Sequence, residues 1–459
     1  MSQNSIRLLG LLGVFLAAWR SEGYFHPDEH FQILEMAAWK YGITPGSALP
    51  WEFGAQMRPA LQPVLAWAAI KASDWAAGFQ PFHIAFLLRF ITGSLFIWVI
   101  RQSDKTFPSS RSFVPFVLLV WFFPLLSVRF SSENYAAMTL MAALIALQQR
   151  PSKAIMAGLW LGLSFQFRYQ MGFAIIGILA WLFWEKRNRD AAKTIIGMVP
   201  GLALGVIADR WFYGNWVFPP WNYFYQNLIA GKAAEFGTEP FWWYFTAFLE
   251  KGILPVSALL LYGAIRGIRK HSRHLFTAVL ITFIIGHSLI GHKELRFLFP
   301  VIIPFLWLSA EGLADLWPKW RTQNTARWLL YLTTGINILL WSYVSLTPAI
   351  PSTGAFRYIW NHAPATQRQE YYALDTHPYQ WVTVPVYFYR PPSLKVHILK
   401  DKTHLDSIPS GGKLIVERPF LDDNNAWQRR YTSLPDWLRP FNFNNWQSRT
   451  TFWTIYEKK

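Results

Sequence analysis

The stretch IRLLGLLGVFLAAW (residues 6–19) is followed closely by YFHPDEHFQ (residues 24–32). The first stretch is the earliest of many hydrophobic segments in the chain, and the second places two neighbouring carboxylates, Asp28 and Glu29, directly behind it. An acid pair at the end of a membrane helix faces water on one side of the membrane, where it can accept a proton from a substrate. This order of segments predicts a membrane protein with chemistry at one of its two surfaces.

The composition also indicates a membrane protein. Of 459 residues, 53% are hydrophobic, 18% are aromatic and only 15% are charged, and 26 are tryptophan. The net charge of +17 could suggest nucleic-acid binding, but Lys and Arg fall between apolar segments and form no sustained basic face. They therefore predict membrane topology and no nucleic-acid partner. The chain has no cysteine, which excludes disulfides and thiolate zinc sites.

Apolar runs of roughly spanning length predict an all-α multi-pass membrane protein with about eleven transmembrane helices. The first run is expected to stay as an anchor, because residues 20–24 offer no small-residue cleavage site. Residues 61–79 are interrupted by Lys71 and Asp74, so they are expected to form a helix in the membrane interface. The expected spans are residues 6–19, 82–100, 113–128, 135–147, 154–167, 172–184, 194–212, 241–265, 275–291, 298–316 and 328–346.

The positive-inside rule orients these spans. With the amino terminus inside, every inner loop is basic. The inner loops contain Arg101, Lys105, Arg111, Arg150, Lys153, Lys186, Arg187, Arg189, Lys193, Arg266, Arg269, Lys270, Arg273, Lys319, Arg321 and Arg327. The outer side then receives Asp28, Glu29, Glu133, Arg168, Asp209, Arg210 and the run His292-Lys293-Glu294-Leu295-Arg296. The chemistry is therefore expected on the outer face.

The composition changes after the last span. Residues 348–459 are polar and Pro-rich, and the stretches 381–389 and 413–418 alternate in the manner of β-strands. We predict a transmembrane domain over residues 1–347, whose first outer loop (residues 21–81) carries the acid pair. Residues 348–459 are expected to form a small α+β domain on the same outer face.

The acid pair also has a structural interpretation. Pro27 followed by two acids suits the start of a helix. Such a helix would still hold Asp28 at the water boundary, so capping and catalysis are compatible. His26 and His30, four residues apart, could bind a metal ion together with Asp28, although no third strong ligand lies nearby in the sequence.

The other charged residues each have two interpretations. Glu133 follows two serines and either starts a capped helix or belongs to a site. Arg168 and the run 292–296 either extend along the membrane surface or bind an anionic phosphate at the headgroup level. The crowding of mixed charges in residues 292–296 favours the phosphate.

Several motifs, in order along most of the membrane domain, resemble glycosyltransferase family 22, whose class C members are dolichyl-phosphate-mannose-dependent mannosyltransferases. The motifs are His26-Pro27-Asp28-Glu29, Phe31-Gln32, Glu35, Tyr41-Gly42, Trp51-Glu52-Phe53, Arg58, Pro63, Phe212-Tyr213-Gly214, Asn222-Tyr223-Phe224, Phe236-Gly237-Thr238, Pro240, Trp243-Tyr244, His292-Lys293-Glu294 and Arg296-Phe297. The Phe-Gly-Thr and Trp-Tyr segments are most similar to the GPI mannosyltransferase III branch. Phe236, Glu133 and the additional residues 44–50 depart from that branch.

The resemblance implies a polyprenyl- or dolichyl-phosphate mannose donor and a glycan or glycolipid acceptor. Transfer is expected to invert the configuration of the anomeric carbon, and the protein is expected to contact membrane lipids. We expect Asp28 to be the general base, with Glu29 as its orienting neighbour or an acceptor ligand. His292, Lys293, Arg296 and Arg168 are the expected ligands of the donor phosphate. The expected acceptor and sugar contacts are Glu133, Trp51, Glu52, Arg58, Trp243 and Tyr244. No resident metal is assigned, and a divalent cation (Mg²⁺ or Mn²⁺) shared by Asp28 and Glu133 stays open.

Two other functions can be considered. A transporter or flippase of a lipid-linked sugar would need ionisable groups near midspan and repeated halves, whereas the ionisable groups here cluster at one end. A sugar-binding scaffold would leave the charges of residues 292–296 unexplained. The outer loops contain no Asn-x-Ser/Thr sequon and the sequence shows no endoplasmic-reticulum retention signal, which favours a bacterial inner membrane over the endoplasmic reticulum.

Overall fold

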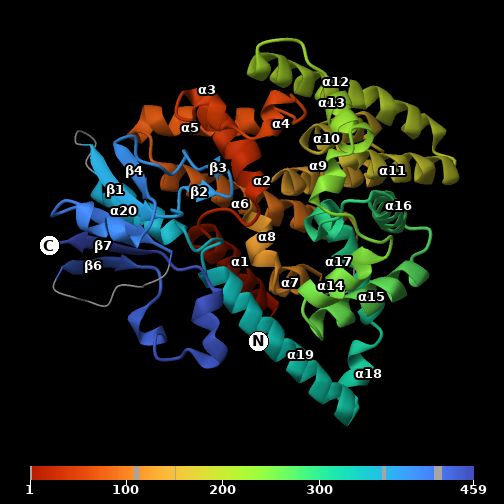
Figure 1. Cartoon of the computed structure of the whole chain (residues 1–459). Coiled ribbons are helices and arrows are strands. Elements are labelled where there is room, and N and C mark those ends of the chain that lie inside the picture. The colour runs from red at the N-terminus through yellow and green to blue at the C-terminus, as the bar shows by residue number, and fades with distance from the viewer. Residues whose placement is uncertain (1–2, 108–112, 150, 364–367, 418–425) are drawn as a thin grey trace. The chain divides into compact units, whose positions relative to one another are not determined.

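The computed structural model describes residues 3–107, 113–149, 151–363, 368–417 and 426–459 (Figure 1). Arg111 and Arg150 of the predicted inner loops lie outside the described residues, as does residue 418, the last of the predicted strand 413–418. The chain is mostly helical and has a small β-sheet near its C-terminus. It divides into two compact units. Unit 1 comprises residues 1–21, 51–66 and 87–347, and unit 2 comprises residues 22–50, 67–86 and 348–459.

Unit 1 is built from helices, with η marking 3₁₀ or π-helical turns. The helices are α1 (Gln3–Arg20), α4 (Trp51–Gly54), α5 (Leu61–Ala77), α6 (Pro81–Thr106), α7 (Phe113–Leu119), α8 (Phe123–Val128), α9 (Ser132–Gln148), α10 (Ala154–Phe167), η3 (Tyr169–Met171), α11 (Gly172–Trp184), α12 (Asn188–Tyr213), α13 (Pro219–Phe224), η4 (Tyr225–Ile229), η5 (Lys232–Phe236), α14 (Trp243–Lys251), α15 (Val256–Lys270), α16 (Leu275–Leu289), η6 (Leu295–Val301), α17 (Ile302–Leu313), α18 (Trp317–Thr322) and α19 (Asn324–Leu346). Helices α5 and α6 continue into unit 2.

Four helical stretches in the described part of the chain are long and apolar enough to cross a membrane. They are Pro81–Thr106, Asn188–Tyr213, Leu295–Leu313 and Asn324–Leu346. Ala154–Phe167, Tyr169–Trp184 and Leu275–Leu289 are apolar but shorter. The membrane character of the fold is thus confirmed, while the total of eleven spans stays a prediction. Residues 61–77 form one helix, as expected, and its interfacial position stays a prediction as well.

Two predicted spans are wrong as continuous helices. The run 113–128 breaks into α7 and α8, and Pro124 lies in the first turn of α8. The run 241–265 breaks into α14 and α15, and Pro255 is the N-cap of α15. Proline has no backbone N–H and clashes with the preceding turn, so it starts a helix more readily than it continues one. Hydrophobicity alone could not reveal these breaks.

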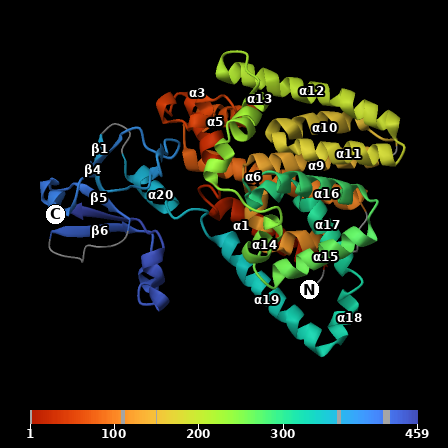
Figure 2. The same ribbon diagram turned by 45° about the vertical axis from the view of Figure 1, so that its right-hand side comes forward.

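Glycines let pairs of helices in unit 1 approach closely. Helix α10 packs between α9 and α12, and Figure 2 shows the three helices side by side. A Cβ atom on Gly158 of α10 would lie 2.1 Å from the Thr194 carbonyl oxygen, and one on Gly197 of α12 would lie 2.1 Å from the Ile155 carbonyl oxygen. Small residues such as glycine, placed four positions apart along one helix, are typical of close helix–helix contacts in membranes. Helices α15 and α17 meet in the same way, because a Cβ on Gly267 would lie 2.0 Å from the Leu308 carbonyl oxygen.

We therefore expect Gly197→Leu to separate α10 from α12 and to destabilise the protein by about 1–3 kcal/mol or more, the range for overpacked cores. The measurement is the thermal unfolding midpoint of the purified protein in lipid. Gly335→Leu is the matched control, because no described atom lies within 4 Å of a Cβ at Gly335 in α19. Equal loss of stability in the two variants would contradict close packing at Gly197.

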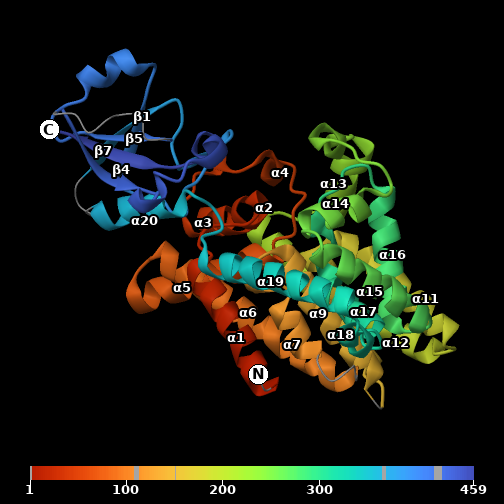
Figure 3. The ribbon, with the colours of Figure 1, turned by 90° about the horizontal axis from the view of Figure 1, so that it is seen from below.

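Unit 2 combines the acid-pair segment with the C-terminal sheet. Figure 3 shows the strands β1, β4, β5 and β7 beside helix α20. The sheet order is β4-β1-β5-β7-β6; β1 runs parallel to β4 and β5, and β7 runs antiparallel to β5 and β6. The elements are α2 (Pro27–Glu29), η1 (His30–Leu34), α3 (Glu35–Tyr41), η2 (Gly46–Ala48), α20 (Thr353–His362), β1 (Gln369–Leu374), β2 (Gln380–Trp381), β3 (Val384–Pro385), β4 (Leu394–Leu399), η7 (Lys402–Ser407), β5 (Lys413–Val416), β6 (Trp427–Thr432), η8 (Asp436–Leu438), η9 (Phe443–Arg449) and β7 (Thr454–Lys458).

The small mixed domain near the C-terminus is confirmed as a sheet with helices. The strand expected over residues 413–418 appears as β5. The strand expected over residues 381–389 is wrong, because β2 and β3 form a short antiparallel pair and a turn follows them. The domain boundaries at residues 347 and 348 stay a prediction, and the compact units group residues 22–50 and 67–86 with the C-terminal domain.

Candidate active site

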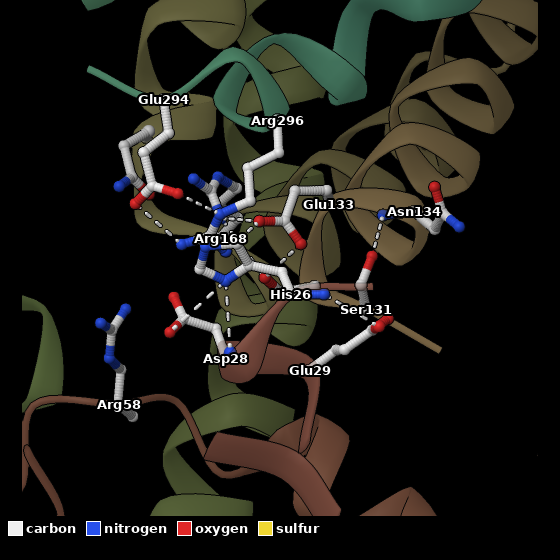
Figure 4. Close-up of polar contacts among 12 residues, drawn as sticks. His26, Asp28, Glu29, Arg58, Ser131, Glu133, Asn134, Arg168, Glu294 and Arg296 are labelled. Carbon is white, nitrogen blue, oxygen red and sulfur yellow. Dashed lines mark hydrogen bonds and ion pairs between the residues drawn. The ribbon is translucent and has the colours of Figure 1, made fainter. Parts of the chain in front are cut away.

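The two neighbouring acids of unit 2 have different environments. His26 is the N-cap of α2, and its Nδ1 accepts a hydrogen bond from the Asp28 backbone N–H at 3.3 Å. The Glu29 carboxylate folds back and accepts hydrogen bonds from the backbone N–H groups of Phe25 and His26, which completes a capping box. Glu29 is buried, whereas the Asp28 side chain is 28% exposed. The helix-start interpretation is confirmed, and it leaves Asp28 as the more exposed acid of the pair. Figure 4 shows the Asp28 and Glu29 side chains pointing to different sides of the α2 start.

The alternative metal site at His26, Asp28 and His30 does not form in this structure. His26 Nδ1 is 3.8 Å from Asp28 Oδ1, but His30 Nε2 lies 2.8 Å from Glu35 Oε1. Within the described ranges, no group of three or more His, Asp or Glu side chains is arranged to hold a metal ion. His30 is therefore part of the interior of unit 2.

Unit 1 contains a buried network of charges centred on Glu133. Glu133 lies in the first turn of α9, where Ser131 caps the helix by accepting a hydrogen bond from the Asn134 N–H at 3.4 Å. Glu133 Oε1 accepts hydrogen bonds from Arg168 Nη1 at 2.8 Å and from Arg296 Nη1 at 2.9 Å. Figure 4 shows both guanidinium groups directed at this carboxylate. The capped-helix interpretation of Glu133 is thus confirmed, and the same residue also joins two predicted phosphate ligands.

The network contains two guanidinium groups and two carboxylates, and one of its donors is unused. Arg296 Nε donates to Glu294 Oε2 at 2.8 Å. The Arg168 guanidinium lies 4.8 Å from the centre of the Phe297 ring. Its Nε is buried and has no hydrogen-bond partner among the described residues. A buried donor without a partner is destabilising, so this atom is suited to an oxygen atom supplied by a ligand.

The two residues before Glu294 stabilise the loop between α16 and η6. Lys293 Nζ donates to the carbonyl oxygens of Ile290 at 2.6 Å and of Glu239 at 2.8 Å, and burial lowers its pKa. His292 Nδ1 lies 3.1 Å from the Gly237 carbonyl oxygen, and its Nε2 lies 3.2 Å from Glu294 Oε1. Both ring nitrogens thus face acceptors, which favours the protonated imidazole. The hydrogen bond to Glu294 raises the pKa of His292 above its usual value.

This arrangement predicts a pH-dependent contribution of His292 to stability. Because the pKa is raised on folding, the stabilisation is fully present below the unfolded-state pKa of about 6.5 and is lost as pH rises through the folded-state pKa. We expect His292→Gln to lower the unfolding midpoint most near pH 5.5 and least above pH 8, and the measurement is a pair of thermal scans across that range. A gap that stays constant with pH would show that the imidazolium charge does not contribute.

The expected acceptor ligands fall into two groups of unit 1. Trp51 begins α4 and is 44% exposed. Glu52 forms an ion pair with Arg58, whose guanidinium lies 5.4 Å from the Tyr223 ring. The Tyr213 hydroxyl donates to the Arg58 carbonyl oxygen at 2.8 Å. Glu52, Arg58 and aromatic rings are therefore brought together, which suits a sugar.

The second group lies on α14. Trp243 is partly exposed, and its ring lies 5.4 Å from Lys251 Nζ. Tyr244 is buried, with its ring centre 6.5 Å from that of His287. Tyr244 thus packs inside the helical unit, and of this pair only Trp243 offers a ring to the outside.

Sequence analysis missed two buried arginines of unit 1. Arg89 lies in the N-terminal half of α6, and its Nε donates to the Ala18 carbonyl oxygen at 2.8 Å. Arg129 Nη1 donates to the Ser21 carbonyl oxygen at 2.7 Å. Both guanidinium groups therefore satisfy carbonyls at the C-terminal end of α1, where cations are favourable. An arginine inside an apolar run, as at Arg89, was the available signal.

Comparison with known proteins adds the family. Residues 6–393 match the model of the Alg9-like mannosyltransferase family. The chain belongs to this family. The resemblance to glycosyltransferase family 22 is thereby confirmed. Relatives of this mannosyltransferase-family chain include GPI alpha-1,2-mannosyltransferase 3 of Danio rerio, which is 36% identical over 132 residues that cover 28% of this chain and 24% of the relative.

GPI mannosyltransferase 3 of Aspergillus fumigatus is 24% identical over 450 residues that cover 78% of this chain and 56% of the relative. The names of these relatives confirm the similarity to the GPI mannosyltransferase III branch. The match covers about a quarter of the Danio rerio relative and about half of the Aspergillus fumigatus relative. Among solved structures, ArnT of Cupriavidus metallidurans bound to undecaprenyl phosphate has a TM-score of 0.52 at 13% identity and covers 98% of this chain and 97% of ArnT. The two proteins share the fold, which confirms the predicted class C architecture.

Proposed function

We propose that this chain is an inverting mannosyltransferase, which moves mannose from a polyprenyl-phosphate donor to a hydroxyl of a glycan or glycolipid acceptor at the outer face of the membrane. The family match over residues 6–393 carries the proposal. The names of the relatives support mannose as the transferred sugar. The ArnT structure contains undecaprenyl phosphate, which supports a lipid phosphate as the donor group.

Asp28 is the proposed general base. Its carboxylate takes the proton of the acceptor hydroxyl while the hydroxyl oxygen attacks the anomeric carbon of mannose. The bond between that carbon and the phosphate oxygen breaks on the opposite face, and the polyprenyl phosphate leaves with its electron pair. One displacement inverts the anomeric centre, so a β-linked donor yields an α-mannoside. The partly exposed Asp28 side chain supports this role, while the buried Glu29 carboxylate stabilises the turn that presents Asp28.

The donor phosphate is proposed to bind beside Arg168 and Arg296. A lipid-linked sugar phosphate is a diester with a single negative charge. Within the network the two guanidinium groups are matched by Glu133 and Glu294. Lys293 adds a further cation nearby in the sequence, and its Nζ donates to backbone carbonyl oxygens. Arg168 Nε is the donor with an unused hydrogen. Fixed cations stabilise the negative charge that develops on the leaving phosphate. Phosphate binding by Lys293 would require exchange of its carbonyl hydrogen bonds, and binding by His292 would require exchange of its bonds to Gly237 and Glu294.

The acceptor sugar is proposed to contact the exposed ring of Trp51, the Glu52–Arg58 pair and Trp243. Glu133, which the sequence placed with the acceptor, is already bonded to Arg168 and Arg296, and we propose that it orients these two cations. No specific observation favours the flippase. We propose a bacterial inner membrane as the location, with the endoplasmic reticulum as the alternative.

The test uses the full chain purified into lipid nanodiscs. Synthetic polyprenyl-phosphate mannose is supplied with a panel of mannoside and glycolipid acceptors, and GDP-mannose serves as the control donor. We expect transfer from the lipid donor alone, with an α-linkage in the product by NMR. Absence of transfer to every acceptor, combined with movement of the lipid donor between leaflets, would favour the flippase instead.

A further inference from the structure

A fully buried carboxylate connects the Asp28 segment to the C-terminal domain within unit 2. Glu35, the first residue of α3, is 1% exposed. Its Oε1 accepts hydrogen bonds from the backbone N–H groups of Tyr387 at 2.7 Å and Phe388 at 2.9 Å. These two residues lie in the turn after β3, more than 350 positions further along the chain. One side chain of the first loop thus binds the main chain of the C-terminal domain.

Two further donors complete the surroundings of this carboxylate. His30 Nε2 lies 2.8 Å from the same Oε1, and the Thr44 hydroxyl donates to Oε2 at 2.6 Å. Since the backbone groups and the hydroxyl all donate, Glu35 acts as an acceptor and His30 carries its hydrogen on Nε2. His30 Nδ1 has no hydrogen-bond partner in the part of the chain that the structure describes, so the Glu35 carboxylate is the polar contact of this ring.

Aromatic packing reinforces the same connection. The His30 ring lies between Tyr24 and Tyr389, with ring centres 4.9 Å and 5.6 Å away and interplanar angles of 27° and 9°. Tyr389 also packs against Phe82 and Phe356 at 5.3 Å and 5.5 Å. Tyr389 is 1% exposed, so the stack belongs to the core of unit 2. The C-terminal domain therefore holds His30 by its ring as well as Glu35 by its carboxylate.

Asp28 lies at the start of this anchored helical run. Helices α2, η1 and α3 follow one another without a break from Pro27 to Tyr41. The Glu29 capping box fixes the N-terminal end of the run, and Glu35 fixes the point where the π-helical turn η1 passes into α3. Asp28 and Glu35 thus lie in one continuous helical run, which is bonded to a turn of the C-terminal domain at Glu35.

We propose that Glu35 is a positioning residue, and that the C-terminal domain, through residues 387–389, holds the general base Asp28 in its reactive orientation. The role of Asp28 in this inference rests on the proposed function. Misplacing a catalytic group by about 1 Å can lower the rate about 10²-fold. In this proposal, the C-terminal domain contributes to the active site by orienting Asp28.

Two substitutions at Glu35 test whether its hydrogen bonds are required: one variant keeps the acceptor oxygen and the other removes it. In Glu35→Gln the amide oxygen still accepts from Tyr387 and Phe388, and the amide N–H can donate to Thr44. Glu35→Ala removes every acceptor. We expect Glu35→Ala to lower kcat by about 10²-fold with donor and acceptor KM nearly unchanged, and Glu35→Gln to retain kcat within about threefold.

A second measurement does not depend on activity. The chain has no cysteine, so Ser47→Cys in the first loop and Lys395→Cys on β4 are the only labelling sites for a pair of spin labels. Both positions are exposed and belong to unit 2. We expect a narrow distance distribution in the parent protein and in Glu35→Gln, and a broad one in Glu35→Ala. Monodisperse elution and retained helicity of Glu35→Ala show that the rest of the protein is folded.

The outcomes are distinct. A broadened distance together with a lost kcat supports the inference. Unchanged kcat in Glu35→Ala overturns it, whether or not the distance broadens, and so does a lost kcat with an unchanged distance. If the parent protein transfers no mannose but Glu35→Ala broadens the distance, the proposed function fails while the connection through Glu35 stands.

Discussion

Asp28→Asn is expected to lower kcat for mannose transfer by about 10²–10⁴-fold, the range that a positioned general base contributes. The amide has nearly the shape of the carboxylate but cannot take the proton of the acceptor hydroxyl. Asp28 is the solvent-reachable member of the acid pair, with 28% of its side chain exposed. Its backbone N–H donates a hydrogen bond to His26 Nδ1. The substitution does not change this backbone group, so the start of α2 should be retained.

The measurement is initial rates at saturating donor and acceptor, with donor binding followed separately. Glu29→Gln is the first control, since its amide oxygen can still accept the N–H groups of Phe25 and His26. Asp315→Asn is the second, because this carboxylate lies on the surface beside Lys270. Both controls should keep most of the activity. Equal rates for Asp28→Asn and the parent protein would remove Asp28 from the chemistry.

Glu133→Ala is expected to destabilise the protein by about 3–5 kcal/mol, the loss that follows when one partner of a buried ion pair is removed. Arg168 and Arg296 are 7% and 9% exposed, and both donate to Glu133. Without this carboxylate, Arg168 loses its ion pair at a nearly fully buried position. The expected result is a much lower unfolding midpoint in lipid and a loss of transfer activity.

Glu133→Gln separates charge from shape. The amide oxygen can still accept a hydrogen bond, but Arg168 loses its charged partner while Arg296 keeps its ion pair with Glu294. We expect an intermediate midpoint. Glu235→Ala is the matched control, because Glu235 forms an exposed pair with Lys232 and exposed pairs contribute little. If Glu133→Ala and Glu235→Ala unfold at the same temperature, Glu133 does not hold the buried cations.

Much of the helical architecture could be predicted from local patterns. The expected runs 154–167 and 172–184 coincide with α10 and α11, because apolar length and flanking polar residues are properties of consecutive residues. The start of α2 at Pro27 and the cap of α9 at Ser131 were likewise readable, since capping groups lie within a few residues of the helix that they serve. The breaks before α8 and α15 were missed because apolar character continues through them.

Sequence alone therefore determined the membrane class, most helices and the position of the acid pair, because these depend on hydrophobicity and backbone chemistry over short stretches. The tertiary structure decided which charges meet. Glu133 bonds Arg168 and Arg296, which lie 35 and 163 positions away, and Glu35 bonds the main chain 352 positions away. A buried charge needs a partner, and the fold can supply that partner from any part of the chain. A local sequence pattern therefore cannot predict which residue it will be. For the same reason, only the structure shows that Glu29 caps a helix while the Asp28 side chain is partly exposed.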